Sequence, residues 1–311
     1  MSDFKKPENV RTKLMWKFAT CMIEEKCTIF GGFVRDMLIS EVNFSSEEYT
    51  GDFSVYPNDI DMVVDGATPF SFKSGKLEQL CQKAGFECTL LEIVESERGS
   101  YETMTYEVKP FHSDLLGLKD CSFKVDLVKS VPHLSPPFNK LDMLCNGFIW
   151  DLSGVRFSKN CGLKMDSESD ISRKMKEAQT LGSMLNRETE MVVPNILQVN
   201  YEPMSPEMIT LRKSLIRRIC KMWKKRWNIT NLKHLRQITY IRGIVPDEYQ
   251  TEVCPICQQS FDNDDVAVQC NACKVLTCVS CFEEYSMAEL EGRITIRCPN
   301  TCSLRDGWKL W

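Results

Sequence analysis

Eight cysteines near the end of the chain have the spacing of zinc ligands. They follow the pattern C-x2-C-x12-C-x2-C-x4-C-x2-C-x16-C-x3-C and lie at Cys254, Cys257, Cys270, Cys273, Cys278, Cys281, Cys298 and Cys302. A Cys-x-x-Cys turn offers two thiolates to one tetrahedral zinc ion, and two such pairs complete its four ligands. The pattern therefore predicts two closed, structural Zn²⁺ sites that supply much of the folding free energy of this small segment. A chance run of buried cysteines is the alternative, and the repeated pairing argues against it.

Three aspartates form a second set of candidate metal ligands. In the run NDIDMVV, Asp59 and Asp61 are two residues apart, so both side chains point to one face if the run is a strand. Asp126 lies in another strand-like run, FKVDLVK, where alternation can direct it to the same face. Three carboxylates on one face suit Mg²⁺, which also binds substrate phosphates and can activate an attacking hydroxyl. An Asp-x-Asp pair by itself is more often a turn or a solvated edge.

Two glycines precede a short helical pattern in the segment IFGGFVRDML. Gly31 and Gly32 let the backbone approach a phosphate closely, and the helix N-terminus that follows favours negative charge. A Gly-Gly pair alone is usually a tight bend. Its place ahead of the aspartates is what indicates a nucleotide site.

The elements around these residues alternate between helix and strand. Residues 74–84 are predicted as a helix, with Ser74 as its N-cap and Gly85 as its end. Strands are predicted at 88–94, 101–109 and 122–129, and a hairpin joins 147–150 to 155–157. This order predicts an α+β head with helices packed on a mixed sheet. The expected division is a head over 10–165, a helical basic segment over 166–246 and a zinc domain over 250–311.

The middle segment combines a helical apolar pattern with strong positive charge. From Leu211 to Arg242 there are eleven Lys or Arg residues and no Asp or Glu, although the whole chain has a net charge of −4. Such a local field attracts a polyanion, and Lys224, Lys225 and Arg226 are the candidate RNA contacts. Trp223 falls on the apolar stripe, which favours a core position over base stacking. A merely solvated basic face is the alternative.

The composition is that of an ordinary globular protein. Hydrophobic residues make up 43% of the chain and charged residues 26%. We find no run of eighteen apolar residues and no secretory signal at the start, and therefore expect a reducing compartment, cytoplasm or nucleus, and no membrane contact. In such a compartment, cysteine clusters indicate metal rather than disulfides.

The phrases VCPIC and RCPNTC, together with the order of the cysteine pairs, resemble the RING finger family. The resemblance implies interleaved sites, in which Cys254 and Cys257 join Cys278 and Cys281, while Cys270 and Cys273 join Cys298 and Cys302. Ile256 matches the position where that family contacts a ubiquitin-conjugating enzyme. An inert zinc-stapled interaction module remains the alternative.

The head resembles the nucleotidyltransferase superfamily that includes CCA-adding enzymes and bacterial-type poly(A) polymerases. The matching phrases are GGFVRD, then DID, then the acidic strand residue Asp126, and then LDMLCNG. The resemblance implies that Asp59 and Asp61 hold the metals and that Asp126 is the third carboxylate. It also implies that Gly31 and Gly32 contact the triphosphate. Arg35 and Asp36 would brace that loop. Asp142 and Asn146 would position the nucleotide. The segment between Gly32 and Asp59 is longer than in that family.

Together these features predict an enzyme that adds nucleotides to an RNA 3′ end without a template, carrying a RING-like zinc finger. Its expected cofactors are two Zn²⁺ and catalytic Mg²⁺, and its expected partners are a nucleoside triphosphate and an RNA 3′ end. The alternative is a ubiquitin-ligase or adaptor protein whose head is not catalytic and whose partner is a ubiquitin-conjugating enzyme.

Overall fold

The computed structural model describes most of the chain. The described residues are 7–51, 55–64, 76–95, 101–111, 121–130, 141–158, 170–193, 197, 205–232, 237–241, 253–261, 265–291, 293, 295–302, 307–308 and 310. The chain divides into two compact units. Unit 1 comprises Met1–Leu141 and Cys145–Leu181, and unit 2 comprises Asp142–Leu144 and Gly182–Trp311.

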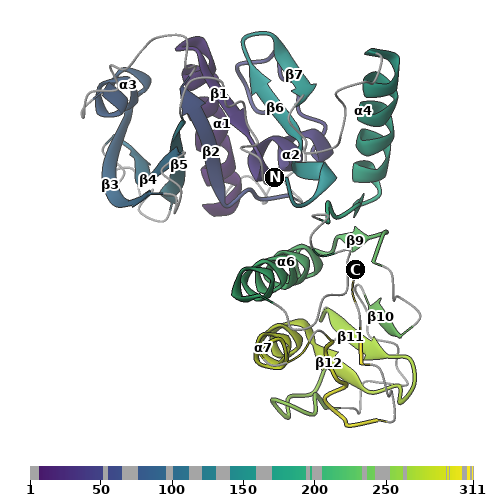
Figure 1. The fold of residues 1–311 in the computed structure, drawn as a ribbon. Helices are drawn as coiled ribbons and strands as arrows, with labels where there is room; N and C mark the ends of the chain where they lie inside the picture. Colours follow the sequence, from purple (N-terminus) through teal and green to yellow (C-terminus); the bar gives the residue numbers. More distant parts are fainter. Residues whose placement is uncertain are drawn as a thin grey trace. The chain divides into compact units, whose positions relative to one another are not determined.

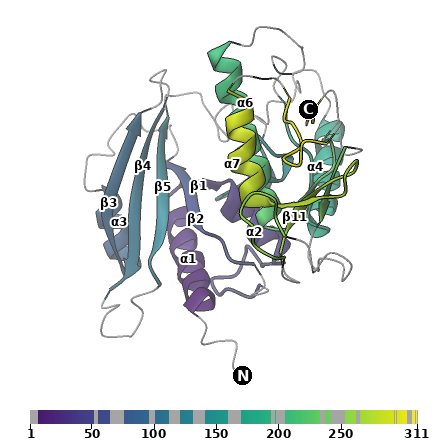
Figure 2. The same ribbon diagram turned by 90° about the horizontal axis from the view of Figure 1, so that it is seen from below.

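Unit 1 is built on a seven-stranded mixed sheet with the order β3-β4-β5-β2-β1-β6-β7. The strands are β1 (Cys27–Phe30), β2 (Asp59–Val64), β3 (Phe86–Glu95), β4 (Tyr101–Pro110), β5 (Phe123–Ser130), β6 (Phe148–Asp151) and β7 (Gly154–Phe157). Strands β2 and β5 are parallel, and the other neighbours are antiparallel. The long strands β3, β4 and β5 lie side by side at one edge (Figure 2). The predicted α+β class with a mixed sheet is confirmed.

One face of this sheet is covered by helices α1 (Pro7–Glu24) and α3 (Lys76–Ala84). Phe18 of α1 packs edge-to-face on Phe86 and Phe123, whose side chains point to this face. Because side chains alternate along a strand, the residues between these buried ones point to the opposite face. Asp126, between the buried Val125 and Leu127, therefore lies on the face that α1 does not cover.

The glycine pair leads into helix α2 (Gly32–Ile39), as predicted. The long segment that follows α2 packs on the core through aromatic rings. Trp16 stacks on Trp150 with ring centroids 4.8 Å apart, and Phe44 meets both indoles edge-on. The inserted residues therefore add to the hydrophobic core of unit 1.

The predicted strands and the hairpin match β3 to β7 within two residues. Helix α3 ends at Ala84, and Gly85 follows with a φ of 87°. Ser74, the predicted N-cap, lies outside the described residues. Two boundaries between the units fall within elements of the chain, one in the short turn η3 (Leu144–Asn146) and one in helix α4 (Asp170–Leu185).

Unit 2 contains the basic helix and the cysteine-rich segment (Figure 1). Helix α6 (Pro206–Lys224) begins after Ser205, whose hydroxyl accepts a hydrogen bond from the Met208 N–H. It packs beside α7 (Val279–Glu289). A three-stranded antiparallel sheet joins β10 (Ile238–Ile241), β11 (Ala267–Cys270) and β12 (Leu276–Cys278), while β8 (Glu188–Thr189) pairs with β9 (Asn228–Ile229). Strand β10 precedes Pro246 in the sequence but forms part of the same sheet as the two strands of the cysteine-rich segment.

No helix in the described part of the chain combines the length and the apolar character needed to cross a membrane.

Candidate metal centres and carboxylate site

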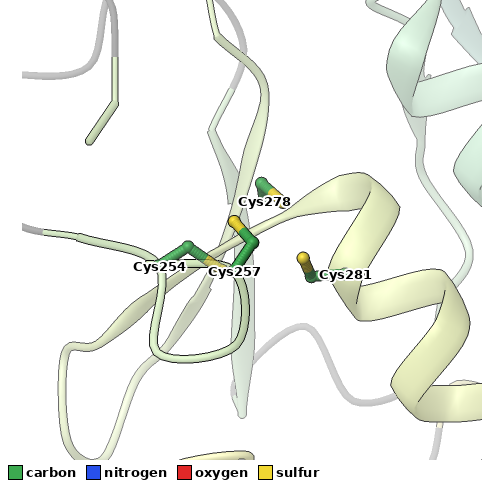
Figure 3. A group of neighbouring side chains, drawn as sticks. All are labelled: Cys254, Cys257, Cys278 and Cys281. Carbon is green, nitrogen blue, oxygen red and sulfur yellow. The ribbon is translucent and has the colours of Figure 1, made fainter. Parts of the chain in front are cut away.

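The eight cysteines form two tetrads. Cys254, Cys257, Cys278 and Cys281 make up the first, and Cys270, Cys273, Cys298 and Cys302 the second, with the ligand atoms of each within 4.8 Å of one another. This is the interleaved grouping that the RING resemblance implies. In Figure 3, one loop supplies the first two cysteines of the first tetrad, and the start of α7 supplies the other two.

The geometry of the tetrads fits zinc. In the second tetrad, the Cys270 and Cys302 sulfurs are 3.6 Å apart, as are the Cys273 and Cys298 sulfurs. A tetrahedral site with Zn–S bonds of about 2.3 Å has sulfurs about 3.8 Å apart. All eight ligand positions are cysteines, and four thiolates leave no open coordination position, so the sites suit structural zinc.

The thiols of each tetrad differ in acidity. Burial alone would raise the pKa of the Cys254 thiol, but backbone N–H groups, including that of Cys257, lower it. Burial would also raise the pKa of the Cys273 thiol, but the Val275 N–H and the neighbouring thiols lower it. Burial raises the pKa of Cys281 and so do the neighbouring thiols. Cys254 therefore reaches the metal-binding thiolate form more readily than Cys281, and Cys273 more readily than Cys298, whose pKa is raised by burial.

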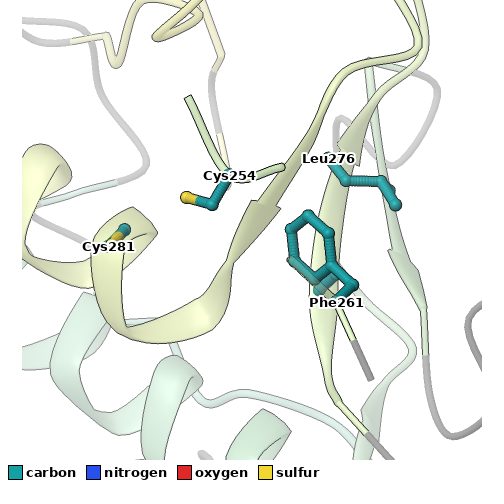
Figure 4. Packing of buried hydrophobic residues seen from close by; sticks show 5 residues of the cluster. Cys254, Phe261, Leu276 and Cys281 are labelled. Carbon is teal, nitrogen blue, oxygen red and sulfur yellow. The ribbon is translucent and has the colours of Figure 1, made fainter. Parts of the chain in front are cut away.

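A small apolar cluster surrounds the first tetrad. Cys254 and Cys281 pack with Phe261, Ala267 and Leu276, all less than a tenth exposed (Figure 4). Two of the five members of this cluster are candidate zinc ligands, so metal coordination at the first tetrad is expected to stabilise the packing around it.

In unit 1, the three aspartates share one face of the sheet. Asp59 and Asp61 lie on β2, and the parallel register places Asp61 beside Asp126 of β5. All three are partly exposed, whereas Ile60 on the opposite face is fully buried. Among the described residues, the groups of three or more ligands within 4.8 Å are the two cysteine tetrads, so the aspartates do not form a third closed cluster. Mg²⁺ is held by one or two carboxylates together with water and substrate phosphates, so an open arrangement fits it.

The glycine turn lies directly against one of these carboxylates. Gly31 has a φ of 76° and is the N-cap of α2. A Cβ built on Gly31 would lie 2.7 Å from Oδ2 of Asp61. The turn therefore needs glycine for its backbone conformation and for this close approach. The N-terminus of α2 and a candidate metal ligand are thus neighbours.

Arg35 and Asp36 form a buried brace behind this turn. Nε of Arg35 donates to Oδ1 of Asp36 at 2.7 Å, and Nη1 donates to Oδ1 of Asn146 at 2.9 Å. Burial alone would lower the pKa of the Arg35 guanidinium, but the adjacent Asp36 carboxylate raises it. Asn146 thus supports α2 through Arg35. Asp142, expected to position nucleotide, belongs to unit 2, where it forms an ion pair with Arg218.

Two residues that sequence reasoning missed also support the carboxylates. Nη2 of Arg11 on α1 donates to the backbone carbonyls of Pro57 and Asn58, each at 2.9 Å, immediately before Asp59. Oγ1 of Thr105 on β4 donates to Oδ1 of Asp126 at 2.7 Å. No spacing in the sequence marks either residue, because strand register and helix packing create both contacts.

Several basic residues of α6 are paired with acidic residues of unit 2. Lys213 pairs with Glu291, and Lys224 pairs with Glu283, each at 2.8 Å. Arg217 and Lys221 lie one helical turn apart and are exposed. Trp223 and Trp227 are buried, as the apolar stripe predicted for Trp223.

Next to the first zinc site, two apolar side chains are exposed. Ile256 lies between the first two ligands and is 39% exposed, and Val253 is 49% exposed. Neither belongs to a tetrad, so both side chains are exposed apolar groups beside the first tetrad.

No protein-family model, curated protein or solved structure that was compared with this chain matches it.

Proposed function

We propose that this protein transfers nucleotides from a nucleoside triphosphate to an RNA 3′ end in a reaction that depends on Mg²⁺. The observation that supports this most is the register of β2 and β5, which sets Asp61 beside Asp126 on the face opposite α1. The Gly31 turn lies against the same Asp61 carboxylate. Transfer of a nucleotidyl group requires metal ligands close to a backbone turn that binds phosphate.

Each residue has a role in this proposal. Asp59, Asp61 and Asp126 hold Mg²⁺, which when bound activates the attacking hydroxyl and neutralises the leaving pyrophosphate. The backbone N–H groups at the start of α2 hold the triphosphate, since Gly31 and Gly32 leave room for it. The Arg35 brace keeps that turn in place.

Unit 2 supplies the RNA-binding surface in this proposal. The candidate contacts Lys224, Lys225 and Arg226 lie at the end of α6, and the exposed Arg217 and Lys221 extend the positive surface along the helix. Because Lys224 is already paired with Glu283, we assign the larger share of phosphate binding to Arg217 and Lys221.

The test is incubation of the full chain with a short RNA and each labelled nucleoside triphosphate in turn, with and without Mg²⁺. We expect extension of the RNA with at least one triphosphate, and loss of extension in Asp61→Asn. An amide keeps the volume of the side chain but loses the charge that binds Mg²⁺. Glu107→Gln is the matched control, because Glu107 is an exposed carboxylate on β4 that faces Lys124 rather than an aspartate. A wild-type chain that extends no RNA with any triphosphate would refute the proposal.

A second candidate function is that of a RING-type ubiquitin ligase. The exposure of Ile256 beside the first tetrad favours it, since a side chain left in water at that position is available to a ubiquitin-conjugating enzyme. The two functions belong to different units and do not exclude each other.

A further inference from the structure

Thr105 stands beside the third carboxylate of the proposed site. The antiparallel register of β4 and β5 sets Thr105 opposite Asp126, and its Oγ1 lies 2.7 Å from Oδ1 of Asp126. On its other side, Asp126 neighbours Asp61 of β2. The Asp126 carboxylate thus has a hydroxyl donor on one strand and a second carboxylate on the other.

We infer that Thr105 is a positioning residue that orients Asp126 for the metal, an inference that rests on the proposed function. A hydroxyl that donates to a carboxylate at this distance forms a short, charge-assisted hydrogen bond. That bond fixes Oδ1 of the carboxylate and leaves Oδ2 as the oxygen that a metal ion would bind. Without it, repulsion from Asp61 would favour other side-chain conformations of Asp126.

The neighbouring positions of β4 show that this contact is specific to Thr105. Two residues away on the same face, Thr103 lies opposite Val128, and Glu107 lies opposite Lys124. A threonine in a strand is ordinarily explained by its β-branched shape. That explanation predicts that valine, which keeps the shape, can replace Thr105 without effect on metal binding.

The experiment measures nucleotide addition by the full chain as a function of Mg²⁺ concentration. We expect Thr105→Val to raise the Mg²⁺ concentration that gives half the maximal rate, or to lower the maximal rate. The combined effect on activity should be about 10- to 100-fold, the usual cost of removing a residue that orients a metal ligand. Thr105→Ser keeps the hydroxyl and should restore most of the activity. Thr103→Val is the matched control and should behave as wild type. Melting temperatures should stay close to wild type in all three variants.

Direct metal binding separates this inference from the proposed function. Calorimetric titration of zinc-loaded protein with Mn²⁺ should give a weaker affinity for Thr105→Val than for wild type and Thr103→Val. If wild type adds no nucleotide but this difference appears, the proposed reaction fails and the role of Thr105 stands. If wild type is active and Thr105→Val matches it in rate and in Mg²⁺ dependence, the inference is overturned and the function stands. The absence of Mn²⁺ binding in wild type would overturn both.

Discussion

The indole of Trp223 on α6 stacks on the ring of Tyr240 on β10, with ring centroids 5.2 Å apart and planes 9° apart. The Tyr240 hydroxyl also donates to the Trp223 carbonyl at 2.5 Å. Trp223 further meets Phe282 of α7, which in turn stacks on Trp308. A continuous group of aromatic rings therefore ties the basic helix to the elements that carry the zinc ligands.

This arrangement predicts that removal of zinc disrupts α6 together with the cysteine-rich segment. Cys278 and Cys281 lie at the start of α7, whose Phe282 packs on Trp223. Purified protein should contain about two zinc ions per chain, one for each tetrad. After chelation, hydrogen exchange should accelerate in α6 and α7, while the strands of unit 1 stay protected. Unchanged protection of α6 would show that the helix folds independently of the metal.

A single ligand variant refines this prediction. Cys257→Ser should lower the zinc content by about one ion per chain, because it removes one of four thiolates from the first tetrad. Cys220→Ala is the control, since Cys220 is a buried thiol of α6 outside both tetrads. Elemental analysis of the two purified variants measures the difference, and equal zinc contents would contradict the assignment of the ligands.

The site residues that were predicted from the sequence are those whose signal lies within one strand or one turn. Asp59 and Asp61 follow from alternation along β2, and the cysteine pairs follow from their spacing. Thr105 and Arg11 carry no such signal, because each donates a hydrogen bond to a residue at least twenty-one positions away. Strand register creates the contact of Thr105, and helix packing creates that of Arg11.

The division of the chain shows the same limit. The turn signals around Pro246 predict a boundary between the basic segment and the zinc domain. In the structure, β10 lies before Pro246 yet pairs with β11, and Tyr240 packs on α6. Local turn chemistry marks where the chain bends, whereas pairing between distant strands decides which segments fold together. The structure contains two compact units, and the division into three parts remains a prediction from the sequence.

The RNA-binding proposal predicts an effect of the exposed charges of α6. Replacing both Arg217 and Lys221 with Ala should weaken binding of single-stranded RNA of any sequence. The slope of log affinity against log salt should fall by about 0.7 for each phosphate that the protein no longer neutralises. Lys213→Ala should change the slope less, because Lys213 already pairs with Glu291. Fluorescence anisotropy at several salt concentrations measures both, and an unchanged slope in the double variant would identify α6 as a merely solvated face.

The ligase alternative predicts an effect of Ile256. Ile256→Ala should abolish ubiquitin chain formation and keep both zinc ions, since the side chain is exposed and is not a ligand. Leu152→Ala is the control, because Leu152 is an exposed apolar residue of unit 1. A wild-type chain that forms no ubiquitin chains with a broad panel of conjugating enzymes would leave the zinc module as an interaction module.

The contact between Gly31 and Asp61 provides the most specific test of the carboxylate site. In Gly31→Ala, the new Cβ would lie 2.7 Å from Oδ2 of Asp61, a distance at which one of the two groups must move. We expect loss of most nucleotide addition, because the shift displaces a metal ligand and the N-terminus of α2 together. Alanine at a φ of 76° and a ψ of −140° also adds backbone strain of about 1–3 kcal/mol, which by itself lowers stability. Gly154→Ala separates the two effects: Gly154 has a φ of 93°, but no atom lies within 4 Å of a Cβ built there. Both variants should lose thermal stability through backbone strain, and only Gly31→Ala should lose activity. Equal activity of the two variants, measured as RNA extension per folded molecule, would show that the reacting groups do not lie at the Gly31 turn.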